Sequence, residues 1–273
     1  MKLTMLGTGH AAVTECYNTC FVLEDEAAAP ENKKRYLMVD GGGGNGLLRQ
    51  LKHAGLNWMD MKDIFVTHKH LDHIMGIFWV VRLCCQLMAH GKYEGEVNIY
   101  GHEDVIRSIR TMAETLLLPS ETRYIDDRLH LIAVSDGETR DVNGFKMTFF
   151  DIESTKEKQF GFSLRLKDGR RLVCCGDEPC HPCEEKYAEG CDWLLHEAFC
   201  LYSEADIFKP YEKHHSTVKD ACELAERLAA KNLLLYHTED KNIASRKQLY
   251  TAEGQQYYSG RLYVPDDLES IEI

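Results

Sequence analysis

The chain has 273 residues with 44 acidic and 32 basic side chains, which gives a formal net charge of −12. A chain of this length can bury a core as one large domain or as two small ones. The acidic balance argues against general affinity for nucleic acids, which depends on neutralising phosphates, and no Lys- or Arg-rich run marks a basic patch.

The first half of the chain alternates apolar runs with polar turns. Strands are predicted at residues 3–6, 18–23 and 36–39, with an exposed hairpin loop over 24–34. The third strand ends at Asp40 and a run of four glycines, Gly41 to Gly44. Such a run allows a close approach of the backbone to a neighbour or ligand, or it is simply a tight turn. A short helix around residues 47–51 then leads to a buried strand at 63–66.

The stretch from Val66 to Gly76 follows that strand and reads V-T-H-K-H-L-D-H-I-M-G. Alternate residues of an extended backbone point the same way, so His68 and His70 can bind one cation, with Asp72 and His73 beside them for a second. Imidazole and carboxylate groups suit zinc, with manganese and iron as near substitutes. A polar turn that carries histidines by chance is the less favoured alternative.

Further helices are predicted at 77–88 and 104–118, and further strands at 97–100, 130–134, 145–152, 161–166 and 171–175. The second half repeats the order of buried strands followed by polar side chains. Asp177 follows one such strand and His237 ends the last one, while His215 lies beside a helix start that Ser216 or Thr217 caps. With no composition break, we predict a single domain over residues 1–273, built from two sheet-and-helix halves.

The cysteine content and the N-terminus bear on the compartment. Eleven cysteines without a signal peptide are typical of reduced, mostly buried thiols, so we expect a cytoplasmic protein. No apolar run approaches the roughly 20 residues that cross a bilayer, and no membrane partner is expected. Cys180 and Cys183 have the C-x-x-C spacing, but they lack a thioredoxin-like context, so a redox role is disfavoured.

These motifs together resemble the metallo-β-lactamase superfamily of metal-dependent hydrolases, and most closely its ribonuclease Z-like branch. The resemblance covers most of the chain. It is carried by Leu6-Gly7-Thr8-Gly9, Phe65 through Gly76, Gly176-Asp177, His196-Glu197-Ala198-Phe199, His215-Ser216-Thr217 and Tyr236-His237-Thr238.

The resemblance implies an α+β fold, a four-layer αββα sandwich, with one or two divalent metal ions. By that resemblance His68 and His70 bind one metal, Asp72, His73 and His237 bind the other, and Asp177 binds both. Asp72 also serves as a catalytic group that accepts a proton or orients the nucleophile. His215 is then the catalytic residue that protonates the leaving group.

Two departures from the family pattern affect the substrate and the metals. Family members that cut tRNA precursors carry a long Gly- and Pro-rich arm, but residues 161–177 hold only a hairpin turn, so tRNA is not expected as a substrate. A third histidine for the first metal is also missing, because no histidine lies between His130 and His181. His10, Ser154 and Thr155 are the candidates to replace it.

We therefore expect a metal-dependent phosphodiesterase acting on a small or single-stranded phosphodiester, with a homodimer as one option. One alternative is an esterase, thioesterase or arylsulfatase-like hydrolase on the same site. The other is a ligand-binding or sensing protein without catalysis.

Overall fold

The computed structural model describes residues 1–26 and 34–273, and the chain separates into two compact units. The first unit comprises Met1–Gly7, Tyr17–Val134 and Leu268–Ile273, and the second comprises Thr8–Cys16 and Ser135–Asp267. Each unit contains one sheet with its own helices, as the sequence predicts for each half. The assignment of all 273 residues to one domain stays a prediction.

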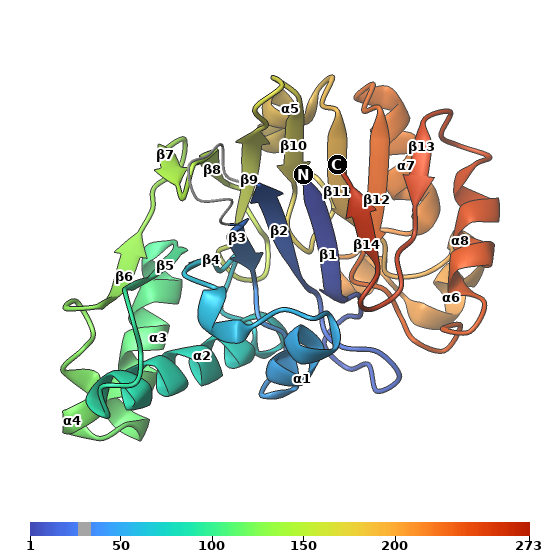
Figure 1. Cartoon of the computed structure of the whole chain (residues 1–273). Helices are drawn as coiled ribbons and strands as arrows, with labels where there is room; N and C mark the ends of the chain where they lie inside the picture. The colour runs from blue at the N-terminus through green and yellow to red at the C-terminus, as the bar shows by residue number, and fades with distance from the viewer. Residues whose placement is uncertain (27–33) are drawn as a thin grey trace. The chain divides into compact units, whose positions relative to one another are not determined.

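The first unit is built on a sheet with the strand order β14-β1-β2-β3-β4-β5-β6 (Figure 1). Its β1, β2, β3 and β14 pair antiparallel, and β3 to β6 pair parallel. The strands are β1 Lys2–Gly7, β2 Cys20–Glu26, β3 Lys34–Val39, β4 Asp63–Phe65, β5 Val97–Gly101, β6 Leu129–Ala133 and β14 Ser270–Glu272. The helices are α1 Gly46–His53, the 3-10 helix Trp58–Asp60, α2 Leu71–Ala89, α3 Glu103–Leu116 and α4 Pro119–Thr122.

Helices α1 and α2 cover this sheet and form its core with it. Leu47 and Leu51 of α1 and Ile77 of α2 pack against strand residues such as Val22 and Ile64. Most residues of α2 are buried, as expected for an apolar core helix, although Leu71 at its start is exposed.

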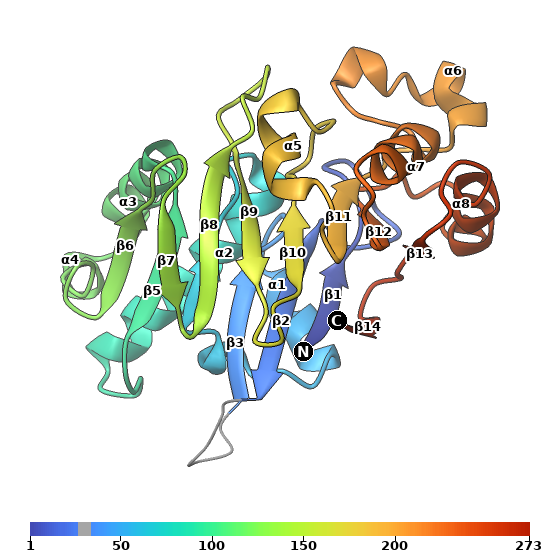
Figure 2. The ribbon, with the colours of Figure 1, turned by 90° about the horizontal axis from the view of Figure 1, so that it is seen from above.

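The second unit is built on the order β13-β12-β11-β10-β9-β8-β7, with parallel pairing from β10 to β13 and antiparallel pairing from β7 to β10. The strands are β7 Thr139–Val142, β8 Phe145–Asp151, β9 Phe160–Arg165, β10 Arg171–Cys174, β11 Trp193–Glu197, β12 Asn232–Tyr236 and β13 Arg261–Tyr263. The helices are α5 Pro182–Ala188, α6 Ala205–Phe208, α7 Val218–Arg227 and α8 Arg246–Gly254, with 3-10 turns at Tyr202–Glu204 and Tyr211–Lys213. Figure 2 shows α5 and α7 beside the strands that they cover.

The predicted strands are present, with ends that shift by a few residues, but three expectations need correction. Helix α2 begins at Leu71 rather than at residue 77. Glu24 lies in β2, buried between Lys2 (3.1 Å) and Lys34 (2.6 Å), rather than in an exposed loop. Residues 27–33 of that predicted loop lie outside the described residues. Of the two predicted capping candidates, Thr217 caps α7, because its side chain accepts a hydrogen bond from the Asp220 amide.

The third correction concerns the length of the longest apolar segment. In the part of the chain that the structure describes, α2 is long and apolar enough to cross a membrane by length and composition alone, which the sequence reading missed. However, 61% of its apolar window is buried inside the fold. A core helix passes the same test, so this is weak evidence for a membrane span.

Candidate metal centre

The first cluster of candidate ligands lies where β4 leads into α2, in the first unit. His68 and His70 are in the turn after β4, and His70 is the N-cap residue of α2 with an extended backbone (φ −60°, ψ 148°). Asp72 and His73 lie in the first turn of α2 rather than in the preceding turn. A carboxylate there is also favoured by the helix dipole.

The donor atoms of this cluster have the spacing of metal ligands. His68 Nε2 lies 2.9 Å from His70 Nδ1, and His73 Nε2 lies 3.3 Å from Asp72 Oδ2. Two nitrogen or oxygen ligands of one tetrahedral zinc ion are about 3.3 Å apart, since each sits about 2.0 to 2.1 Å from the metal. Each pair therefore fits a divalent cation.

A second layer of hydrogen bonds orients these imidazoles. His73 Nδ1 donates to Asp40 Oδ2 at 2.8 Å, and the Thr67 hydroxyl donates to the same oxygen at 2.8 Å. Since the Thr67 proton is used in that bond, its oxygen accepts from His68 Nδ1 at 3.0 Å. Both rings thus carry the proton on Nδ1, which makes Nε2 the nitrogen that would bind a metal.

The glycine run holds this layer in place. Asp40 ends β3, and the Gly41 amide donates to the His73 carbonyl at 2.9 Å. A Cβ on Gly76 of α2 would lie 1.8 Å from the Gly41 oxygen. The run therefore serves a close backbone approach between the loop after β3 and α2, one of the two interpretations drawn from the sequence.

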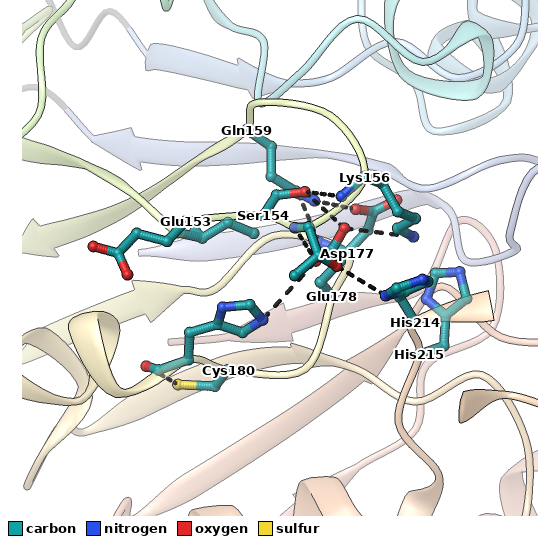
Figure 3. Close-up of polar contacts among 12 residues, drawn as sticks. Glu153, Ser154, Lys156, Gln159, Asp177, Glu178, Cys180, His214 and His215 are labelled. Atoms are coloured by element: carbon teal, nitrogen blue, oxygen red, sulfur yellow. Dashed lines mark hydrogen bonds and ion pairs between the residues drawn. The ribbon is translucent and has the colours of Figure 1, made fainter. Parts of the chain in front are cut away.

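The second cluster lies in the second unit and holds Asp177, His215 and His237. Asp177 follows β10, and its Oδ1 accepts from Gln159 Nε2 at 2.7 Å while its amide donates to Gln159 Oε1 at 3.1 Å (Figure 3). His237 follows β12 in the left-handed region (φ 58°), and its Nε2 lies 3.5 Å from Asp177 Oδ2. This separation again matches two ligands of one tetrahedral ion, about 3.3 Å apart.

The His215 imidazole contacts a carboxylate, that of Glu197, and an aromatic ring, that of Phe199. Its Nδ1 lies 3.6 Å from Oε2 of the fully buried Glu197, and its ring stacks on Phe199 at 5.0 Å. Glu197 Oε1 is held by the Ser216 amide at 2.5 Å and by the Ser216 hydroxyl. The donor atoms of Glu197, His215 and His237 all lie within 4.8 Å of one another, so this carboxylate–histidine pair stands next to a candidate ligand.

The three candidates for the missing histidine differ in their surroundings. The Ser154 hydroxyl donates to Glu178 Oε1 at 2.7 Å (Figure 3). The Thr155 hydroxyl bonds to Nδ1 of the exposed His214 at 2.8 Å, so both hydroxyls already have hydrogen-bond partners. The His10 ring lies 6.3 Å from the His237 ring. Burial and the neighbouring histidines 237 and 215 lower the pKa of His10 to about 4, so its imidazole is neutral at pH 7.

Several supporting residues were not found from the sequence. Asp40 was seen only as a strand end, Glu197 only as part of a family motif, and Gln159 not at all. His196 has a structural role, because its Nδ1 bonds to the Glu197 carbonyl at 2.7 Å and its Nε2 accepts from the Cys180 amide at 3.2 Å. The convergence of both clusters on one centre stays a prediction.

Comparisons with known proteins agree with this chemistry. A sequence model of the family described as "Anti-Pycsar protein Apyc1" matches residues 1–257. Ribonuclease Z of Pyrococcus abyssi is 28% identical over 238 residues, covering 71% of this chain and 74% of that protein.

Solved structures are similar over the whole chain. The metallo-β-lactamase fold protein YhfI from Bacillus subtilis has a TM-score of 0.76 at 17% identity, covering 100% of this chain and 99% of that one. The short form of human tRNase Z has a TM-score of 0.70 at 22% identity, with 100% and 99% coverage. A diphosphatase of the PhnP family has a TM-score of 0.69 at 17% identity, with 100% and 97% coverage. The predicted α+β metallo-β-lactamase-like fold is confirmed.

Proposed function

Because the chain belongs to the Apyc1 family and is a ribonuclease Z-like member of the metallo-β-lactamase superfamily, we propose that it is a metal-dependent phosphodiesterase. The observation that carries the proposal is the oriented ligand set at the start of α2. There the protons on His68 and His73 Nδ1 are fixed by Thr67 and Asp40, as in metal-binding histidines.

We propose that His68 and His70 hold one divalent ion, that Asp72, His73 and His237 hold a second, and that Asp177 is shared. When bound, such ions lower the pKa of a coordinated water and offset charge on phosphoryl oxygens. Zinc suits these donors best, and manganese or iron are the alternatives. The hydrogen bonds from Gln159 hold Asp177 in one orientation for this role.

The protein's own groups then handle the protons. Asp72 accepts a proton from the attacking water or orients it. His215 donates a proton to the departing oxygen, and Glu197 lies 3.6 Å from its Nδ1, where it can orient the ring for this role. Stacking on Phe199 limits the rotation of the His215 ring.

A small or single-stranded phosphodiester is the proposed substrate class. In support, the net charge is −12, and β9 and β10 are joined by a short turn that leaves no room for a tRNA-gripping arm. One of the structural neighbours is described as a diphosphatase of the PhnP family, which is compatible with a small substrate. The relatives named ribonuclease Z and tRNase Z do not support the expectation that tRNA is excluded as a substrate. A tRNA precursor is therefore included among the substrates tested. The cytoplasmic location and the homodimer stay proposals.

The test is turnover of bis-p-nitrophenyl phosphate with added zinc or manganese, beside carboxyl, thio- and sulfate esters, a short single-stranded RNA and a tRNA precursor. We expect turnover of the phosphodiester and the short RNA, and its loss in His68→Ala. His130→Ala is the matched control, because His130 pairs with Glu96 near the protein surface. Faster turnover of another ester class would favour the esterase alternative. Full metal occupancy without turnover of any substrate would favour the ligand-binding alternative.

A further inference from the structure

Two cysteines and a glutamate come together at the ends of the loop that carries Asp177, within the second unit. The donor atoms of Cys175, Cys180 and Glu184 lie within 4.8 Å of one another. Cys175 follows β10 and is fully buried, Cys180 lies in the loop before α5, and Glu184 is in the first turn of α5. None of them belongs to the ligand set of the proposed hydrolytic centre.

The thiol pair is not the one that the C-x-x-C spacing indicates. The Cys183 thiol donates to the Ile152 carbonyl at 3.5 Å and to the Asp151 carbonyl at 3.8 Å. Cys180 is instead hydrogen-bonded to Cys175, and its thiol also reaches the His181 carbonyl at 3.7 Å. The two thiols that face each other are therefore those of Cys175 and Cys180, which are five positions apart in the sequence.

Glu184 is the second, independent observation. Its side chain is fully buried, and Oε1 accepts a hydrogen bond from the His181 amide at 2.7 Å. Within the described ranges, Oε2 is buried and meets no polar group by strict hydrogen-bond geometry, and the carboxyl group's one other side-chain contact is the Cys175 thiol of the same cluster. A buried carboxylate held by one amide and one weakly polar thiol is costly unless a cation compensates its charge.

We propose that Cys175, Cys180 and Glu184 bind a thiophilic divalent cation, with zinc as the best match, at a site separate from the hydrolytic centre. In tetrahedral zinc sites with bonds of about 2.3 Å to sulfur and 2.0 to 2.2 Å to oxygen, two sulfur ligands lie about 3.8 Å apart, and a sulfur and an oxygen about 3.6 Å apart. Both separations are shorter than the 4.8 Å limit within which the three donor atoms of the cluster lie.

The cation has a route to this cluster from solvent. Cys180 lines a surface pocket of about 390 Å³ together with His196, Asp220 and Arg227. Binding would convert both thiols to thiolates and release their protons. A fourth ligand, such as a water, would come from the pocket side.

Such a site would stabilise the loop that positions Asp177. The loop between Cys175 and Cys180 carries Asp177 and Glu178, and Figure 3 shows Cys180 in the same region as these two carboxylates. A single cation bound by Cys175 and Cys180 would tie the two ends of that loop together. This would hold the loop in place independently of the hydrolytic centre.

The experiment uses the full chain, purified reduced and without chelator, then loaded with cobalt. We expect a sulfur-to-cobalt charge-transfer absorption, which nitrogen and oxygen ligands cannot produce, and we expect it to persist in His68→Ala. Cys180→Ser should remove this absorption and one equivalent of bound zinc. Glu184→Gln keeps the hydrogen bond to the His181 amide and should weaken zinc binding at this site by at least about tenfold, the lower range for metal-site variants.

Cys183→Ser is the matched control and should change neither the absorption nor the metal content. Circular dichroism establishes whether each variant is folded. If Cys180→Ser does not fold, Glu184→Gln still tests the proposal. The proposal is overturned if the wild type lacks the sulfur-to-cobalt absorption. It is equally overturned if Cys180→Ser retains all its metal, or if a Cys175–Cys180 disulfide is found in the native protein without bound metal.

Discussion

Replacing Asp40 with asparagine should weaken metal binding without touching a metal ligand. The carboxylate accepts three hydrogen bonds, from His73 Nδ1, the Thr67 amide and the Thr67 hydroxyl, each at 2.8 Å. An asparagine can accept at only one side-chain atom, so at least one of these donors must change. Because Asp40 is buried, water cannot replace the lost acceptor.

The Asp40→Asn substitution can weaken metal binding in two ways, which depend on the orientation of the new amide group. If the asparagine oxygen stays on the Thr67 amide, its NH₂ group faces His73 Nδ1, and the histidine proton moves to Nε2, the atom 3.3 Å from Asp72. A protonated Nε2 cannot bind a metal. If the amide flips, two donors face each other at Thr67, which costs about 1 to 3 kcal/mol. Both routes fit a loss of about 10- to 100-fold in metal affinity, or about 1.4 to 2.7 kcal/mol.

Competition between apo protein and a chromogenic zinc chelator measures this loss. Working in the Cys180→Ser background removes the proposed thiolate site from the count. Asp63→Asn is the control, since Asp63 is also a buried strand carboxylate but accepts from Asn98 at 3.0 Å. Zinc affinity within about threefold of the parent in Asp40→Asn would refute the argument that Asp40 fixes the His73 tautomer.

Three further predictions concern the proton donor, the metals and the packing. His215→Ala should lower turnover of substrates with poor leaving groups by roughly 10²-fold while metal content is retained, and equal loss for nitrophenyl and alkyl leaving groups would contradict this role. Chelation followed by stepwise zinc or manganese addition should show unequal sites, with the pair His68 and His70 filling last. Two equally tight zinc ions in the hydrolytic centre would contradict this. Gly76→Ala should destabilise the fold by about 3 kcal/mol, because its Cβ would overlap the Gly41 oxygen. Gly44→Ala, with no atom within 4 Å of the added carbon, should be nearly neutral in the same thermal melt.

Features that depend on neighbouring residues in the chain could be predicted from the sequence. Alternation in an extended backbone predicted that His68 and His70 point the same way, and their donor nitrogens are 2.9 Å apart. The start of α2 was predicted too late because the first helical turn is polar, and apolar periodicity does not mark such a turn. Strand β7 was missed because three of its four residues are exposed, which leaves little apolar pattern.

Long-range partners could not be predicted in the same way. Asp40 is 33 positions from His73, and Gln159 is 18 positions from Asp177. Nothing in the local sequence of either partner specifies the other, because the sheet brings them together. The partners of Cys183 are equally distant, because its thiol contacts the carbonyls of Asp151 and Ile152, 32 and 31 positions away.

The pairing of β1 with β14 sets a time scale for the newly made chain. Thr4 and Ser270 share a hydrogen bond at 2.8 Å across 266 positions of sequence. At about 5 to 20 residues per second, synthesis of the intervening chain takes about 13 to 53 s. During that interval the outer edge of β1 has no strand beside it, and open edges are where chains associate wrongly. The yield of folded protein should therefore depend on translation speed and chaperone supply more than the stability of the finished fold suggests.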